Sequence, residues 1–316
     1  MTQNLTKIVS RLPIRVKGGI RMSEKIKTGI AVFLIIMILP YIITYALQGR
    51  QLFDIAATER MDKDTGSGQQ DAQEPTETLT GILAGQISME LPEDVIRAQA
   101  VLVRTEYVRR EQTGEQQEQS RSLDELTALW GSGHVREYYE IAKSAVTDTA
   151  GEILTYDGKP IQTAYHQVSA GATRTMEELN GEATPYLQSV LCGTDITSPD
   201  YLTVRFFSYE ELMRALDVKK EDDLRSITQT SDEAGYVSSV LIGEKEISGD
   251  VFRRLLDLPS PCFYIKEVEG QIRIVVKGKG HGIGMSQYAA AKQAEEGASY
   301  QDILSYFFPG TVLEQH

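Results

Sequence analysis

The chain has 316 residues, enough for one large or two medium domains, and a formal net charge of −13. The charge is uneven: residues 1–50 hold eight Lys and Arg and one acid, so the remainder is strongly acidic. An acidic bulk argues against a nucleic-acid-binding surface, because phosphate recognition needs a basic footprint.

An uncharged apolar segment of 20 residues, 28–47, follows a basic segment, 1–27. Its length is about that needed to cross a ~30 Å hydrocarbon core as a helix. Pro40 would kink this helix, which membrane helices tolerate. The preceding basic residues predict a cytoplasmic N-terminus and an exported remainder.

The alternatives for this segment are a cleaved signal peptide and a buried core helix. A signal peptide usually has a shorter apolar region and a small-residue cleavage site, and Ala46-Leu47-Gln48 is a poor site. The sequence therefore favours an uncleaved, single-pass membrane anchor.

Polar residues make up most of the stretch after the anchor, so we expect 48–77 to be a flexible linker. Apolar residues then recur at helical spacing from Leu79 to Ile87. A second helix is expected to begin at Pro92, since Glu93 and Asp94 follow in its first turn.

Strands and helices are mixed in the rest of the chain. Asp157-Gly158 predicts a hairpin between strands at 153–156 and 161–165. A strand-rich module is expected at about 202–258, and more strands between Phe263 and Lys277. We therefore predict an α+β fold: an exported mixed domain, 78–316, with the module inserted in it.

Two cysteines, Cys192 and Cys262, do not make a disulfide framework or a paired-Cys metal spacing. One disulfide is possible in an exported domain, but two buried free thiols are the favoured interpretation. With four His and no His-Glu-x-x-His, we predict no metal site and no cofactor.

The loop Gly278–Gly284, between a predicted strand and a helix-forming run, draws most attention. Its alternating glycines indicate a shaped and mobile loop that presents backbone amides. They do not fit the G-x-G-x-x-G spacing of dinucleotide-binding sites. No packing argument requires His281 in such a loop, whereas His166 is more typical of a structural histidine.

Glu90 lies between Met89 and Leu91, where one predicted helix ends and the next begins. Partial burial there would raise the pKa of a carboxyl group, as a general acid requires, although the following helix N-terminus favours the ionised form. On these residues alone, Glu90 is more typical of a capping or solvated acid.

Four segments, in order, resemble the stage II sporulation protein D (SpoIID)/LytB family. They are the junction around Glu90 with Arg97-Ala98-Gln99-Ala100 to Thr105, the stretch Tyr165 to Gly171, the loop Gly280-His281-Gly282-Ile283-Gly284-Met285-Ser286-Gln287-Tyr288, and Tyr306 to Thr311. The resemblance covers about residues 78–312. One motif would be weak, but four in the family's order are specific.

The resemblance implies lytic transglycosylation of peptidoglycan glycan strands, with Glu90 as the catalytic acid and base. Because the C6 hydroxyl of the sugar replaces water, a second carboxylate is not required. The residues implied to line a glycan groove are Gln99, Arg104, His166, Ser169, His281, Gly282, Ser286, Gln287 and Tyr288.

Two departures from the family pattern stand out. One extra residue, Leu91, separates Glu90 from Pro92, and neither cysteine lies near His166, so no zinc site of the kind some relatives have is expected. The family also implies a cell-wall amidase and a membrane scaffold protein as partners in endospore engulfment. A non-catalytic peptidoglycan-binding or scaffold protein of the same fold is the alternative function.

Overall fold

A computed structural model describes residues 75–316, which lie in one compact unit, Ala72–His316. The expected basic segment 1–27 and membrane anchor 28–47 lie outside the described residues, as does the expected linker up to residue 74. The end of that linker is already helical, because the first described helix begins at Thr76. Among residues 75–316, no helix combines the length and apolarity that crossing a bilayer requires.

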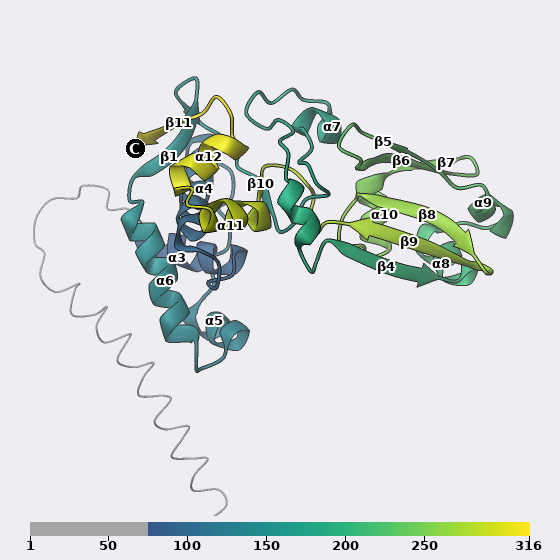
Figure 1. Cartoon of the computed structure of the whole chain (residues 1–316), viewed down its shortest axis with the longest axis horizontal. Helices are drawn as coiled ribbons and strands as arrows, with labels where there is room; N and C mark the ends of the chain where they lie inside the picture. Colours follow the sequence, from purple (N-terminus) through teal and green to yellow (C-terminus); the bar gives the residue numbers. More distant parts are fainter. Residues whose placement is uncertain (1–74) are drawn as a thin grey trace, which may run out of the picture. The chain divides into compact units, whose positions relative to one another are not determined.

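One hydrophobic core is built mainly from helices (Figure 1). Its helices are α3 (Thr76–Gln86), α4 (Glu93–Thr113), α6 (Val135–Asp148), α11 (Gln287–Glu295) and α12 (Tyr300–Phe307), with α5 (Leu123–Trp130) beside α3 and α6. The C-terminal helices α11 and α12 pack against α4. A small antiparallel sheet has the order β11 (Val312–Gln315), β1 (Glu152–Tyr156), β2 (Lys159–Pro160).

Helix α4 begins one residue after the expected start at Pro92. Pro92 precedes it, and the acids Glu93 and Asp94 in its first turn complement the partial positive charge of a helix N-terminus. Gly114 ends it in the left-handed conformation, φ 72°. The helix buries residues along most of its length, so it is the central element of this core.

A second core lies between two three-stranded antiparallel sheets and three helices. The first sheet has the order β4 (Leu202–Phe207), β9 (Gln271–Lys277), β8 (Phe263–Val268); the second has β5 (Thr228–Ser231), β6 (Val237–Ile242), β7 (Lys245–Ser248). The helices are α8 (Tyr209–Leu216), α9 (Glu221–Arg225) and α10 (Gly249–Leu255). Since β8 and β9 share a sheet with β4, the expected module 202–258 is completed by residues 263–277.

The expected hairpin is shorter than predicted. Asp157 and Gly158 form its turn with φ of 51° and 71°, but the second strand ends at Pro160. Residues Tyr165–His166 form β3 instead, which pairs in parallel with β10, Met285–Ser286. This pairing joins two motifs about 120 residues apart in the chain. Two short elements, α7 (Met176–Asn180) and a 3-10 turn (Gly193–Thr197), follow β3.

Candidate functional site

The glycine loop 278–284 is tightly packed, which corrects the expectation of a mobile loop. Gly280 and Gly282 have φ of 116° and 84°, values that L side chains rarely adopt. A Cβ added at Gly280 would lie 2.5 Å from the Cβ of His166, and one at Gly282 would lie 2.6 Å from the Oη of Tyr236. Glycine is therefore required here by close packing as well as by the backbone conformation.

Glu90 is exposed between the buried Met89 and the half-buried Leu91. This confirms the favoured interpretation of a solvated acid over partial burial, because the short turn after α3 directs the carboxyl group to solvent. The hydroxyl of Tyr138, on α6, donates a hydrogen bond of 2.8 Å to Oε1 of Glu90. This bond to the carboxylate raises the pKa of Tyr138, and it holds Glu90 against α6.

A hollow of about 470 Å³ is lined by Ser88 and Leu91 from the turn that carries Glu90, and we call it the Glu90 hollow, although Glu90 itself is not part of its lining. The rest of its lining includes aromatic side chains and polar groups, several of them from distant segments: Gln86, Trp130, Gln167, Ser198, Asp200, Lys279, Gln287 and Tyr288. The ring of Trp130 packs edge-on against Tyr138, with centroids 5.5 Å apart. The hollow thus combines aromatic rings and hydrogen-bonding groups beside the turn that carries Glu90.

The carboxyl group that lines the Glu90 hollow is that of Asp200. Asp200 forms an ion pair with Lys279, with Oδ2 and Nζ 3.1 Å apart. Tyr288 is held nearby by a hydrogen bond of 3.2 Å between its hydroxyl and that of Thr197. Sequence reasoning placed Tyr288 in a groove but missed Asp200, which stands in no motif.

A second hollow, of about 460 Å³, contains His281. Its lining includes Gln86, which also lines the Glu90 hollow, and Glu106, Tyr107, Arg110, Glu118, Gln162, Tyr165 and Ile283. His281 is half-buried there, and burial lowers its pKa. Its Nδ1 accepts a hydrogen bond of 3.1 Å from the backbone N–H of Ile283.

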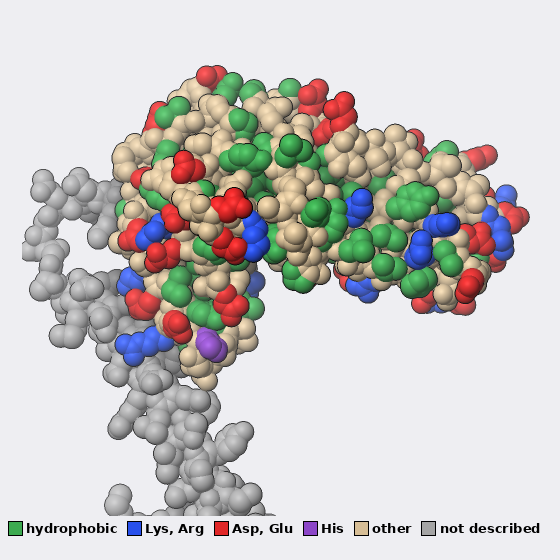
Figure 2. Space-filling view, viewed as in Figure 1, with side chains coloured by type: hydrophobic (Ala, Val, Ile, Leu, Met, Phe, Trp, Pro, Cys, Tyr) green, Lys and Arg blue, Asp and Glu red, His purple; other side chains and the backbone are tan. Residues whose placement is uncertain are grey.

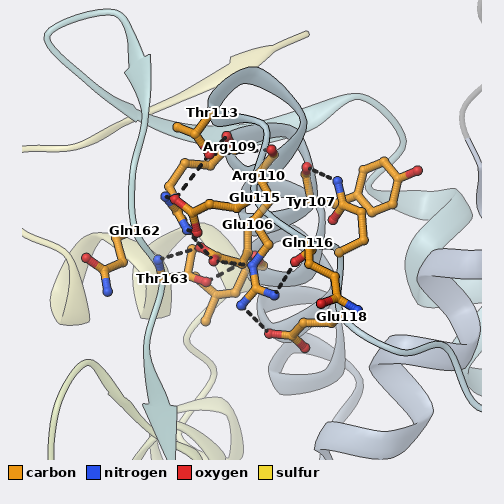
Figure 3. A network of polar contacts seen from close by, with 12 residues as sticks. Glu106, Tyr107, Arg109, Arg110, Thr113, Glu115, Gln116, Glu118, Gln162 and Thr163 are labelled. Atoms are coloured by element: carbon orange, nitrogen blue, oxygen red, sulfur yellow. Dashed lines mark hydrogen bonds and ion pairs between the residues drawn. The ribbon is translucent and has the colours of Figure 1, made fainter.

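Glu106, in this second hollow, is held by two arginines (Figure 3). Arg109 and Arg110 donate hydrogen bonds to Glu106 at 3.0 and 2.7 Å, and the backbone N–H of Thr163 donates at 3.3 Å. Burial alone would raise the pKa of Glu106, but the two guanidinium groups outweigh burial and lower it. Glu106 is therefore ionised near neutral pH and is not a suitable proton donor.

Gln99 and Gln287 were expected to line a groove, and only Gln287 does. Gln99 is fully buried on α4, where its Nε2 donates to Oε1 of Gln86 at 2.9 Å and its Oε1 accepts from Nε2 of Gln287 at 3.2 Å. The three amides form a chain that joins α3, α4 and α11. Gln99 therefore holds the two residues that reach the hollow.

Arg104 is also buried, contrary to the expectation that it contacts substrate. Its guanidinium donates to the carbonyl of Val146 at 2.6 Å and to the hydroxyl of Thr149 at 3.1 Å. These bonds satisfy the C-terminal end of α6. Arg104 thus fixes the helix that carries Tyr138.

His166 lies in the interior, 3% exposed, between β3 and the glycine loop. Its Nδ1 donates a hydrogen bond of 3.1 Å to the carbonyl of Ile283, so Nε2 carries the lone pair of the neutral ring. Burial and the nearby His281, with ring centroids 5.9 Å apart, lower the pKa of His166 to about 3. A neutral, inaccessible ring suits the structural role that the residues alone suggested.

Ser169 and Ser286 are fully buried and meet at Asp195, which sequence reasoning missed. Oδ2 of Asp195 accepts from the backbone N–H of Ser169 at 2.7 Å and from the hydroxyl of Ser286 at 2.8 Å. The Ser286 hydroxyl also caps the N-terminus of α11 by accepting from the N–H of Ala289. Asp195 therefore ties two motifs together, and burial raises its pKa.

Arg174 connects the second core to the glycine loop. Its guanidinium, 1% exposed, forms ion pairs with Asp232 at 3.3 Å and Asp250 at 3.0 Å and lies 5.3 Å from the centre of the Tyr236 ring. The hydroxyl of Tyr236 accepts from the N–H of Ala170 at 3.0 Å, and its ring closes over Gly282. Side chains from residues 202–277 thus pack against the glycine loop and fix its conformation.

Within residues 75–316, no cluster of three His, Cys, Asp or Glu side chains is arranged to hold a metal ion. Cys192 and Cys262 are both buried and free, as the favoured interpretation had it. Burial raises the pKa of their thiols, to about 12 and about 11. Neither is therefore a reactive thiolate near neutral pH.

Several known proteins are similar in sequence to this chain. A family described as stage II sporulation protein matches residues 68–156. The chain is 33% identical over 255 residues to stage II sporulation protein D of Bacillus amyloliquefaciens, covering 76% of this chain and 74% of that protein. It is 30% identical over 254 residues to stage II sporulation protein D of Bacillus subtilis (strain 168), with 76% and 74% covered.

A more distant relative is the amidase enhancer of Bacillus subtilis (strain 168), 23% identical over 296 residues, covering 75% of this chain and 40% of that protein. The two nearer matches exceed or reach 30% identity over most of both chains, and they agree with the family expected from the four ordered motifs. The chain belongs to the stage II sporulation protein D family.

Proposed function

We propose that the protein is a lytic transglycosylase that cleaves peptidoglycan glycan strands between N-acetylmuramic acid and N-acetylglucosamine. The observation that carries the proposal is the position of Glu90. Its carboxyl group is accessible and fixed by Tyr138, and it belongs to a turn whose residues Ser88 and Leu91 line a hollow with aromatic and polar groups. Such a hollow suits a sugar chain, whose rings stack on aromatic side chains and whose hydroxyl groups need hydrogen-bond partners.

In the proposed reaction, the protonated carboxyl of Glu90 donates its proton to the bridging oxygen, and the C1–O bond breaks with an oxocarbenium-like transition state. The resulting carboxylate then takes the proton of the muramic C6 hydroxyl as that oxygen bonds to C1. The proton returns to Glu90, and the product has a 1,6-anhydro end.

The buried motif residues act indirectly in this proposal. Gln99 and Arg104 hold Gln86, Gln287 and α6, and so they are positioning residues. Ser169, Ser286 and His166 stabilise the packing of the glycine loop. The side chains that contact the glycan directly are those that line the Glu90 hollow, above all Trp130 and Tyr288.

We also propose a cellular setting. The apolar segment 28–47 would anchor the protein in the cell membrane, with the N-terminus cytoplasmic and residues 78–316 outside, where they reach the wall during engulfment. The relative named amidase enhancer supports a link to a cell-wall amidase, which would remove stem peptides before the glycan is cut. A membrane scaffold protein is the other partner proposed.

The product of the reaction tests the proposal. The unit 72–316 is incubated with peptide-stripped glycan in ¹⁸O-labelled water, and the new ends are analysed by mass spectrometry. A lytic transglycosylase yields 1,6-anhydro ends without ¹⁸O. Reducing ends that carry ¹⁸O would instead indicate hydrolysis, with Asp200 as the candidate second carboxylate. Glycan binding without any new ends would favour the non-catalytic scaffold.

A further inference from the structure

The outer face of the sheet β4-β9-β8 is apolar and basic (Figure 2). Leu202, Val204 and Phe206 alternate along β4 on this face and are 56%, 45% and 55% exposed. The strand register places Val204 opposite Val275, and Val275 opposite Tyr264, which is 60% exposed. Since directly opposite residues share a face, these side chains form one patch, which we call the β4 face.

Three cations belong to the β4 face. Lys277 is opposite Leu202, Arg273 is opposite Phe206, and Lys266 is opposite Arg273. None of the three forms an ion pair within residues 75–316, and Nε of Arg273 is buried without a hydrogen-bond partner there. No Asp or Glu lies directly opposite any of these three cations in the strand register. A basic face on a chain with a net charge of −13 favours an acidic partner.

The two edges of this sheet differ. The backbone of β8 is capped by the Gln229 side chain, which donates to the carbonyl of Phe263 at 2.8 Å and accepts from the N–H of Ile265 at 3.2 Å. In the described part of the chain, β4 pairs only with β9, so its other edge is open. Soluble proteins normally protect a long apolar edge strand, because its unpaired N–H and C=O groups bind other strands.

We propose that the β4 face binds an acidic, extended segment of a partner protein, which pairs with the open edge of β4. Alternate side chains of the added strand would be apolar, against Val204 and Phe206, or acidic, against Arg273 and its neighbouring lysines. A second copy of the chain fits less well, since its own β4 face carries the same positive charge. The β4 face belongs to a sheet that covers the second core, and its proposed role is separate from the activity proposed for Glu90.

An array of octapeptides tests the proposal with the full-length protein in detergent. One half alternates Glu with Val, Ile, Leu, Phe or Tyr, and the other half has Lys in place of Glu. We expect binding to a subset of the acidic peptides only. The double substitution Lys266→Glu and Arg273→Glu should weaken that binding at least tenfold, whereas Lys219→Glu with Lys220→Glu, exposed cations outside the β4 face, should not.

Circular dichroism of each variant confirms that its fold is kept, and the surface substitution Val204→Glu gives a second variant whose acidic charge also opposes the peptide. Three results would overturn the proposal. They are absence of binding to any acidic peptide, binding that both double substitutions change equally, and binding only to phosphatidylglycerol vesicles, which would identify a lipid surface instead.

Discussion

Replacing Gly282 by alanine would place a methyl group within 2.6 Å of the hydroxyl oxygen of Tyr236 and closer still to its ring. The ring has little freedom to move. Its hydroxyl is held between Ala170 and Ala172, and Arg174 lies over its face. The substitution therefore forces the glycine loop away from the second core.

Two free-energy costs add in the Gly282→Ala variant. A left-handed conformation costs alanine about 1–2 kcal/mol relative to glycine, and overpacking a filled site costs about 1–3 kcal/mol more. The expected loss of unfolding free energy is thus about 2–5 kcal/mol. Because the loop also carries His281 and leads into Gln287 and Tyr288, glycan cleavage should fall as well.

Urea unfolding of the unit 72–316, followed by circular dichroism, measures the loss. Gly270→Ala is the matched control: Gly270 has φ 78°, but a Cβ there meets no atom within 4 Å. This control should lose only the backbone cost, about 1–2 kcal/mol. If both variants lose the same free energy, close packing of Tyr236 on the loop is not what requires glycine at 282.

Three further predictions concern the interior and the Glu90 hollow. His166 stays neutral to a pKa of about 3 when folded but protonates near 6.5 when unfolded. Stability should therefore fall by up to about 1.4 kcal/mol per pH unit as the pH drops between these values, and His166→Phe should reduce that slope in urea titrations. Arg174→Met leaves Asp232 buried without its cation and should cost about 3–5 kcal/mol, part of which Asp232→Asn restores in the double variant; full additivity would contradict the pairing. Tyr138→Phe removes one hydrogen bond to Glu90 and should lower kcat about fivefold with little change in KM, and an unchanged kcat would exclude a positioning role.

Local signals predicted much of the fold. The start of α4 followed from Pro92 and two acids, and the tight turn of the first hairpin followed from Asp157-Gly158. The strands of residues 202–258 were also expected, because alternation of apolar and polar residues records which face of a strand is buried. The boundary of this module was wrong because sheet partners are set by tertiary pairing, which brings β8 and β9 to β4.

Long-range contacts could not be predicted in this way. The parallel pairing of β3 with β10 and the meeting of Ser169 and Ser286 at Asp195 join residues far apart in the chain. Motif membership was also a poor guide to exposure. Polar residues such as Gln99 and Arg104 are buried because α4 is covered on several sides and their hydrogen bonds are satisfied internally.

The most direct test of the proposed activity is Glu90→Gln, compared with Glu93→Gln as a matched control in the first turn of α4, where the acid is also exposed. Both variants are checked for fold and for binding to peptide-stripped glycan, and the release of 1,6-anhydro ends is measured. Because glutamine cannot supply the proton, Glu90→Gln should bind glycan and lose cleavage by at least about 100-fold, while Glu93→Gln keeps it. Undiminished 1,6-anhydro products from Glu90→Gln would contradict the assignment of Glu90 as the acid and base.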